Sequence, residues 1–202
     1  MQSLVVIGAG KVGQVLARRF HEARQFTVLA VLNRSYASAA KAVAFIGAGQ
    51  ACQTPAELPE ADSYLLAVSD DQLTAAALML PASLNLHDKV IWHCSGALAA
   101  RHLASLSSRG ALLASCHPVR SFADPTQAYA GFAGTLCACE GEPRALALLL
   151  PALQAAGADV FQLDAEHKAL YHAAAVMANN YLVSLLDSAA LTYQAAGLPA
   201  AL

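Results

Sequence analysis

Short apolar runs alternate with longer stretches of helix-forming residues along most of the chain. This alternation is typical of a sheet whose strands are mostly parallel and covered by helices on both faces. We therefore predict an α/β fold with a doubly wound, mostly parallel sheet. The predicted strands are 4–7, 26–32, 51–53, 63–68, 90–93, 112–116, 134–139 and 159–162. The predicted helices are 12–22, 37–45, 69–80, 97–107 and 143–156.

From about residue 164 the strand pattern ends, and helix formers continue towards the end of the chain. This segment predicts one long helix over residues 165–196, which Gly197 and Pro199 would end. We therefore divide the chain into a sheet domain, residues 1–163, and a helical segment, residues 164–202. A single helix this apolar cannot bury its own surface, because helices owe most of their stability to packing. It either docks back on the sheet domain or pairs with a second copy, and we expect a homodimer.

The first predicted strand runs directly into a glycine-rich turn, Gly8-Ala9-Gly10-Lys11-Val12-Gly13. In a turn of this pattern Gly8 allows the sharp bend, Gly10 lets a pyrophosphate approach the backbone, and Gly13 lets the next helix pack closely on the sheet. The free N–H groups at the start of that helix face the phosphates. Because the motif lies between two apolar strands and opens a helix, it predicts a dinucleotide site on a Rossmann-like sheet.

The end of the second strand indicates which dinucleotide binds. NAD-dependent enzymes usually carry Asp or Glu there, whose carboxylate accepts hydrogen bonds from the adenosine ribose. Here the position holds Asn33, followed by Arg34 and Ser35. The amide removes a charge that would repel a 2′-phosphate, Arg34 offers a fork for phosphate oxygens, and Ser35 offers a donor. We therefore predict NADP(H) over NAD(H); the alternative interpretation is that Arg34 is a solvated turn residue.

Two further strand ends offer candidate cofactor contacts, because ligands of open α/β sheets lie beyond the carboxyl ends of the strands. The fourth strand ends in Ala67-Val68-Ser69, and the fifth is followed by Ser95 and Gly96. Ser69 and Ser95 are also suited to cap the helices that follow them. Gly96 would let substrate or nicotinamide come close to the backbone. We predict that Ala67, Val68, Ser69 and Ser95 contact the nicotinamide side of the cofactor.

The candidate catalytic residues come from the sixth strand end and from the long helix. His117 is followed by Pro118, which fixes the backbone at the strand exit, and its imidazole titrates near neutrality, as proton transfer requires. Alternatively, His117 only bonds a backbone group. On the helix, Lys168, His172 and Asn179 lie within roughly 40° of one another at 100° per residue. Such a polar row is either a hydrogen-bonded seam between helices or a surface that faces substrate.

The composition argues against several other functions. Of the 202 residues 57% are hydrophobic and 13% charged, with a net charge of −2 and no basic run, so we expect no nucleic-acid partner. No apolar run reaches about 18 residues and residues 1–10 lack a basic segment, so we expect no membrane span, no signal peptide and a cytoplasmic location. The five cysteines show no CxxC spacing and HExxH is absent, which predicts neither a disulfide framework nor a metal site.

Together these motifs resemble the Rossmann-like proteins with a carboxy-terminal DUF2520 domain. The matching segments span nearly the whole chain and are Gly8 to Gly13, Leu66-Ala67-Val68-Ser69-Asp70-Asp71, His93-Cys94-Ser95-Gly96-Ala97, His117-Pro118, Lys168-Ala169-Leu170-Tyr171-His172-Ala173-Ala174 and Asn180-Tyr181. The resemblance implies kinship with pyrroline-5-carboxylate reductase, F420-dependent NADP reductase and 6-phosphogluconate dehydrogenase-like enzymes, and it favours Asn180 over Asn179. His117-Pro118 is also similar to the His-Pro element of prephenate dehydrogenases. Proteins of this kind usually continue into several more helices, whereas this sequence ends at Leu202.

The sequence therefore predicts an NADP(H)-dependent oxidoreductase that transfers hydride to or from a small carbonyl or imine substrate. The predicted catalytic residues are His117, Lys168, His172 and Asn180, with His117 or Lys168 handling the proton. The cofactor carries out the hydride chemistry, while the protein supplies position and electrostatics. The alternative is a non-catalytic, redox-sensing NADP-binding protein whose helix is a dimerisation surface. If further helices close the pocket in relatives, catalysis here would be lost, unless a partner chain supplies that surface.

Overall fold

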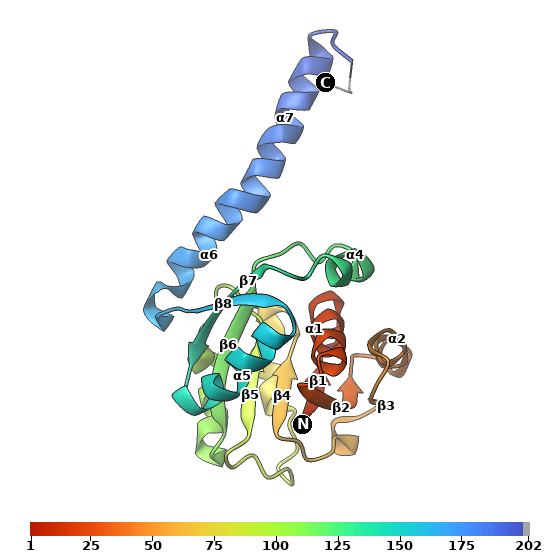
Figure 1. The fold of residues 1–202 in the computed structure, drawn as a ribbon, viewed down its shortest axis with the longest axis vertical. Coiled ribbons are helices and arrows are strands. Elements are labelled where there is room, and N and C mark those ends of the chain that lie inside the picture. Colours follow the sequence, from red (N-terminus) through yellow and green to blue (C-terminus); the bar gives the residue numbers. More distant parts are fainter. Residues whose placement is uncertain (200–202) are drawn as a thin grey trace.

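One eight-stranded sheet forms the centre of the protein in the computed structural model, which describes residues 1–199 (Figure 1). The strands are β1 (Gln2–Ile7), β2 (Phe26–Leu32), β3 (Gln50–Cys52), β4 (Ser63–Leu66), β5 (Val90–His93), β6 (Leu112–Pro118), β7 (Thr135–Gly141) and β8 (Ala158–Gln162). Their order is β3-β2-β1-β4-β5-β6-β7-β8. All neighbours are parallel except β6 and β7, which run antiparallel. The predicted doubly wound, mostly parallel sheet is confirmed.

Helices cover both faces of this sheet. They are α1 (Lys11–Glu22), α2 (Tyr36–Ile46), α3 (Leu73–Leu78), α4 (Pro125–Ala130), α5 (Pro143–Ala155), α6 (Lys168–Val176) and α7 (Leu182–Ala195), with 3-10 segments η1 (Pro55–Glu57), η2 (Asp70–Gln72), η3 (Ala100–Arg109) and η4 (Ala165–His167) and the π-helical segment η5 (Met177–Tyr181). One buried cluster joins α1, α2, α4 and α5 to the sheet, and the other joins α3 and η3 to its opposite face. Along β1, Leu4 and Val6 belong to the first cluster, and Val5 and Ile7 to the second. Burial on both faces explains why the strands are continuous apolar runs.

The predicted strands all lie within two residues of the observed ones, but the helices differ at three places. The helix predicted over 69–80 divides into η2 and α3, and Pro81 follows shortly after its end. The helix predicted over 97–107 is 3-10 and begins only at Ala100. The helix α4 was not predicted, although Asp124 caps it by accepting a hydrogen bond from the Gln127 N–H at 2.8 Å, and Pro125 starts it.

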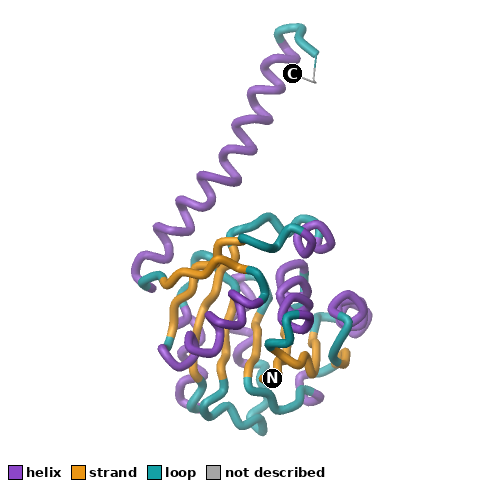
Figure 2. Tube along the Cα trace, in the orientation of Figure 1, coloured by secondary structure: helices purple, strands orange, loops and turns teal. Residues whose placement is uncertain are grey.

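The predicted long carboxy-terminal helix is present. Segments η4, α6, η5 and α7 form one continuous rod from Ala165 to Ala195 (Figure 2). The rod begins beside β8 and extends away from the sheet, so α7 does not dock back on it (Figure 1). Many of its large apolar side chains are therefore exposed: Leu170, Met177, Tyr181, Leu182, Val183, Leu185, Leu186, Leu191 and Tyr193. Within residues 1–199 no helix is both long enough and apolar enough to cross a membrane.

Candidate active site

The glycine turn after β1 has the close contacts that its sequence implies. Gly8 has a φ of +80°, and a Cβ there would lie 2.4 Å from Val68 Cγ1. A Cβ on Gly13 would lie 2.8 Å from Ala67 Cβ, so this glycine lets α1 pack closely on the end of β4. A Cβ on Gly10 would instead enter open space, with Gly8 O at 3.9 Å as its nearest neighbour. Gly8 and Gly13 thus serve the fold, whereas Gly10 leaves room for a ligand.

The amino terminus of α1 faces this room with uncapped N–H groups. Gly10 is the N-cap residue, and no side chain caps the helix. The first intrahelical bond runs from the Gln14 N–H to Gly10 O at 3.1 Å, which leaves the N–H groups of Lys11, Val12 and Gly13 for a ligand. A helix start of this kind stabilises negative charge, and phosphate above all.

A cavity of about 1080 Å³ lies beyond the carboxyl ends of β1, β2 and β4. The predicted cofactor residues that line it are Gly8, Ala9, Gly10, Asn33, Arg34, Ser35, Ala67, Val68 and Ser69. Lys11, Val12 and Gly13 form the adjoining helix start and do not line the cavity, and neither does Ser95. The volume slightly exceeds the usual range for small-molecule sites, about 300–1,000 Å³, and so suits a ligand as large as a dinucleotide.

The rim of this cavity at β2 and α2 carries two cations and no carboxylate. Besides Arg34, it includes Lys41 from α2, a residue that the sequence analysis missed. Lys41 lies in the second turn of α2, whereas Arg34 precedes the N-cap residue Ser35, so helical spacing does not relate the two residues. Asn33 donates weakly from Nδ2 to Ala9 O at 3.5 Å, while its Oδ1 is buried without a hydrogen-bond partner. Ser35 accepts from the Ser38 N–H at 3.3 Å and so caps α2.

The capping predicted for Ser69 is wrong, and that predicted for Ser95 is only partly right. Ser69 Oγ donates to Asp71 Oδ1 at 2.5 Å and makes no capping bond. Ser95 Oγ accepts from the N–H groups of Ala97 and Leu98 at 3.2 and 2.9 Å, and donates to Asp70 Oδ2 at 2.8 Å. The Ser95 hydroxyl therefore closes a turn that precedes η3, which begins at Ala100.

Buried His93 holds the other end of this turn. Its Nδ1 accepts from the Ser95 N–H at 3.2 Å, and its Nε2 lies 3.3 Å from Ala99 O. These bonds require a neutral ring with the hydrogen on Nε2. Burial lowers the pKa of His93 to about 4, which keeps the ring neutral at physiological pH. His93 thus shapes the loop around Gly96 rather than facing a ligand.

Two predicted site residues meet at Gly96. The rings of His117, at the end of β6, and His172, on α6, lie 5.5 Å apart between centroids in an edge-to-face arrangement. A Cβ on Gly96 would lie 2.2 Å from His172 Nδ1 and 2.8 Å from His117 Cε1. Glycine is therefore required here because a larger residue would clash with the two imidazoles. The sequence had instead suggested that Gly96 makes room for substrate or nicotinamide. The buried Nδ1 of His172 has no hydrogen-bond partner within the described chain.

His117 also contacts Tyr171. His117 Nδ1 lies 3.1 Å from Tyr171 Oη, and the two rings pack edge to face with centroids 5.8 Å apart. Burial is the main cause that lowers the pKa of His117 to about 4, and the nearby His172 and Lys168 lower it further. Burial raises the pKa of Tyr171 to about 12. At neutral pH the pair is therefore a neutral imidazole and a protonated phenol.

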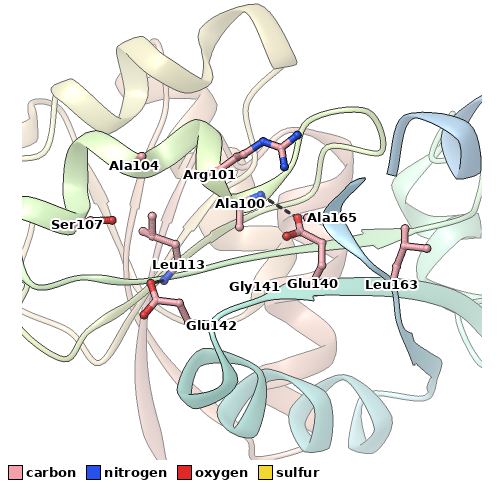
Figure 3. Close-up of a pocket in the computed structure, with 10 residues that line it drawn as sticks. All are labelled: Ala100, Arg101, Ala104, Ser107, Leu113, Glu140, Gly141, Glu142, Leu163 and Ala165. Atoms are coloured by element: carbon pink, nitrogen blue, oxygen red, sulfur yellow. Dashed lines mark hydrogen bonds between the residues drawn. The ribbon is translucent and has the colours of Figure 1, made fainter. Parts of the chain in front are cut away.

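Lys168 lies beneath this group and is only 1% exposed. Its Nζ donates to Ser115 Oγ at 2.6 Å and lies 3.4 Å from Glu140 Oε1. Glu140, on β7, is 5% exposed and also accepts from the Ala100 N–H at 2.8 Å. Figure 3 shows that carboxylate at the wall of a second cavity, of about 450 Å³, between η3 and β7. The sequence analysis missed Glu140 because it lies on an antiparallel strand far from Lys168 in sequence.

The asparagines of the long helix lie away from the histidine pair. Asn179 is exposed and donates to Ala175 O at 3.0 Å, and Asn180 is exposed and makes no side-chain hydrogen bond within residues 1–199. Asn180 follows His172 by eight residues, or on the order of 10 Å along a helix axis. The π-helical segment η5 also alters the 100° spacing on which the predicted row depended. The row of Lys168, His172 and Asn179 is thus divided between buried and exposed surroundings.

The comparisons with known proteins agree with this architecture. No curated protein matches the chain. Protein TM1727 from Thermotoga maritima is 26% identical over 97% of this chain and 71% of its own, with a TM-score of 0.73. BF3122 from Bacteroides fragilis, named as a candidate NADP oxidoreductase, is 20% identical over 98% and 74%, with a TM-score of 0.79. A variant imine reductase from Myxococcus stipitatus, solved with NAD+, is 18% identical over 98% and 68%, with a TM-score of 0.72.

These solved structures share the fold across nearly the whole chain, including the long helix. The family assignment comes from the sequence matches. Residues 135–202 match a domain of unknown function (DUF2520), which covers β7 to the helical rod. Residues 2–118, which contain the glycine turn and His117, match the Rossmann-like domain. The chain belongs to the Rossmann-like domain family, with a DUF2520 segment at its carboxyl end.

Proposed function

We propose that the protein is an oxidoreductase that binds NADP(H) and transfers hydride between the nicotinamide and a small carbonyl or imine substrate. The observation that carries this proposal is a shared sheet edge. Strands β1, β2, β4, β5 and β6 are mutually parallel, so the 1080 Å³ cavity beyond their carboxyl ends and His117 at the carboxyl end of β6 lie on the same edge of the sheet. Ligands of open α/β sheets bind at that edge. A cofactor held by the glycine turn would therefore extend towards His117.

Three observations support a dinucleotide in the cavity. Gly10 leaves open space where a Cβ would otherwise lie, directly beside uncapped helix N–H groups. Asn33 Oδ1 is a buried acceptor without a partner, which a ribose hydroxyl would satisfy. Arg34 and Lys41 provide positive charge for a 2′-phosphate at the same rim. When bound, the nicotinamide would supply or accept the hydride.

His117 is better placed than Lys168 to contact a substrate. The Lys168 ammonium is buried and already bonded to Ser115 and Glu140, so we propose that it supports the site from below. His117 Nε2 makes no hydrogen bond within residues 1–199 and is not among the buried unpartnered atoms. It is thus available to a carbonyl oxygen or imine nitrogen. We retain His172 as a second contact and Asn180 as a residue that would need a closing surface to reach the substrate.

The names of the structural neighbours support the same reaction class. BF3122 is named as an NADP oxidoreductase and the Myxococcus stipitatus protein as an imine reductase. The latter structure contains NAD+, so the preference for NADP(H) here depends on Arg34 and Lys41 rather than on the neighbours. The imine or carbonyl class and the cytoplasmic location stay predictions.

A second candidate function is a non-catalytic, redox-sensing NADP-binding protein that pairs through its helix. The exposed apolar side chains of α7 favour it, because such surfaces are usually covered by a partner. We propose that residues 1–163 bind the cofactor, and that residues 164–202 form the dimer contact or the substrate side. Both functions share the cofactor site and differ in turnover.

Turnover with NADPH separates the two functions. We would measure NADPH oxidation with a panel of small ketones and cyclic imines for the wild type and for His117→Ala. The proposal predicts turnover that this variant loses, with its NADPH affinity unchanged. His102→Ala, an exposed histidine on η3, is the matched control and should keep full activity. Tight NADPH binding without turnover on the whole panel would leave only the second function.

The cofactor preference is tested by titrating NADPH and NADH into the wild type, Arg34→Ala and Lys41→Ala. Hydrogen bonds between charged groups contribute about 1.5–3 kcal/mol, so each substitution should weaken NADPH binding roughly tenfold to hundredfold. NADH binding should not change. Arg144→Ala, whose guanidinium pairs with Asp88 on the surface, is the control. Equal wild-type affinities for both dinucleotides would contradict the NADP(H) assignment.

A further inference from the structure

The surroundings of His117 distinguish its two ring nitrogens. Nδ1 lies 3.1 Å from Tyr171 Oη. Nε2 has no protein partner in the described chain and is not buried. Gly96 approaches the carbon between them, Cε1, and so fixes the ring plane from one side. One nitrogen therefore bonds the protein, and the other is left for a ligand.

The chemistry of the two groups sets the direction of their hydrogen bond. A phenol is a good donor, but its oxygen is a poor acceptor because a lone pair is delocalised into the ring. The unprotonated nitrogen of a neutral imidazole is a strong acceptor. The phenol of Tyr171 has no other hydrogen-bond partner within residues 1–199. The favoured arrangement is therefore Tyr171 O–H donating to His117 Nδ1, which leaves the ring hydrogen on Nε2.

We propose that Tyr171 is a positioning residue that holds His117 as the neutral tautomer with its hydrogen on Nε2, directed at the substrate. Only the contact between the Nε2–H group and a substrate rests on the proposed function; the tautomer of the ring does not depend on it. An N–H donor that is fixed beforehand stabilises the charge that develops on a carbonyl oxygen or imine nitrogen as hydride arrives. The donor stays neutral throughout, so it takes up no proton before the reaction, and solvent water supplies the proton that completes the reduced product.

The charges around His117 agree with a neutral ring. The His117 ring, on β6, faces three residues of α6, namely Lys168, Tyr171 and His172, and Lys168 is paired with Glu140 on β7. A protonated His117 would add a positive charge beside a buried ammonium that already has its carboxylate partner. The hydrogen bond from Tyr171 also favours the neutral ring of His117, because an O–H donor at Nδ1 requires that nitrogen to be unprotonated.

The tautomer can be measured without any substrate. In 15N-labelled protein, long-range 1H–15N correlation spectra distinguish the two neutral tautomers, and His117→Gln assigns the His117 signals. We expect the Nε2–H tautomer in the wild type and a mixture of both tautomers in Tyr171→Phe. Tyr181→Phe, an exposed tyrosine on the same rod, is the control and should match the wild type. An Nδ1–H tautomer in the wild type, or a tautomer population in Tyr171→Phe that equals that of the wild type, would overturn the proposal.

The catalytic consequence is measured separately, with NADPH and a small cyclic imine or ketone as probes. Loss of one neutral hydrogen bond predicts a roughly fivefold to tenfold fall in kcat for Tyr171→Phe, with KM and NADPH affinity unchanged. An unchanged kcat beside an altered tautomer would contradict the positioning role. A wild-type protein without turnover would refute the proposed function but leave the tautomer measurement decisive. If Tyr171→Phe does not fold, an Nδ1–H tautomer in the wild-type spectrum would still overturn the proposal.

Discussion

The buried pair of Lys168 and Glu140 should make the base of the helical rod depend on charge balance. The Lys168 Nζ and Glu140 Oε1 atoms lie 3.4 Å apart, in side chains that are 1% and 5% exposed. Glu140→Gln keeps the shape and an acceptor for the Ala100 N–H but removes the negative charge. Lys168→Met removes the positive charge from a side chain of similar length. The double variant removes both charges.

The expected magnitude follows from this geometry. Two unit charges 3.4 Å apart attract by about 5 kcal/mol at an effective dielectric constant of about 20. Measured losses on breaking a buried pair are about 3–5 kcal/mol, because the remaining charge is left uncompensated. The Ser115 hydroxyl still bonds the ammonium at 2.6 Å, so we expect about 3 kcal/mol for Glu140→Gln. The double variant should lie within about 1 kcal/mol of the wild type, since neither charge remains buried.

Urea unfolding followed by tryptophan fluorescence measures these differences. Trp92 is the only tryptophan and is fully buried in the sheet domain, so its emission reports unfolding there. Arg101→Ala, which breaks an exposed pair with Glu166, should have no measurable effect. A Glu140→Gln loss below about 1 kcal/mol, or a double variant as unstable as the sum of the single variants, would refute the reasoning.

Three other predictions follow from single positions. Gly96→Ala places a Cβ 2.2 Å from His172 Nδ1, so it should destabilise the protein by about 1–3 kcal/mol in urea unfolding and abolish turnover while NADPH binding persists. Gly10→Ala should leave the melting temperature unchanged and weaken NADPH binding in a calorimetric titration, whereas Gly13→Ala, with its contact of 2.8 Å, should lower the melting temperature. The pKa values of His93 and His117 are about 4, below the ordinary value of about 6.5, so the unfolded chain takes up protons first as pH falls. The free energy of unfolding should therefore decline between pH 6.5 and 4, by at most about 1.4 kcal/mol per pH unit for each ring. Melting temperatures measured across this pH range check it. A melting temperature that does not change with pH, or that falls as steeply in His93→Gln as in the wild type, would contradict these pKa values.

The sheet and the cavity beside the glycine turn could be predicted because their signals are local. The run from Leu4 to Ile7 is apolar throughout, since both faces of β1 are covered, and the glycines follow it directly. Gly8 and Gly13 make their close contacts with Val68 and Ala67, which the sequence placed at a neighbouring strand end. The position of Arg34 at the cavity could be inferred once the first two strands were known to be neighbours in the sheet.

The inner part of the site could not be predicted from spacing alone. Glu140 meets Lys168 only because β7 runs antiparallel to β6, and nothing in the β7 sequence marks that reversal. The prediction for Gly96 anticipated a close approach but not that His172 would occupy the space. Tyr171 was part of a matched segment, and its bond to His117 joins residues 54 positions apart. Such contacts depend on how α6 crosses the sheet edge.

The π-helical segment Met177–Tyr181 sets the rotational phase of the distal rod. A π turn contains one residue more than an α turn, so everything after it is rotated by about 100° relative to an uninterrupted α-helix. Removing one residue from this segment would restore an α-helix and turn α7 about its own axis, with the sheet domain unchanged. The face that the rod presents to any covering surface is therefore determined by one extra residue, independently of the residues that form the face.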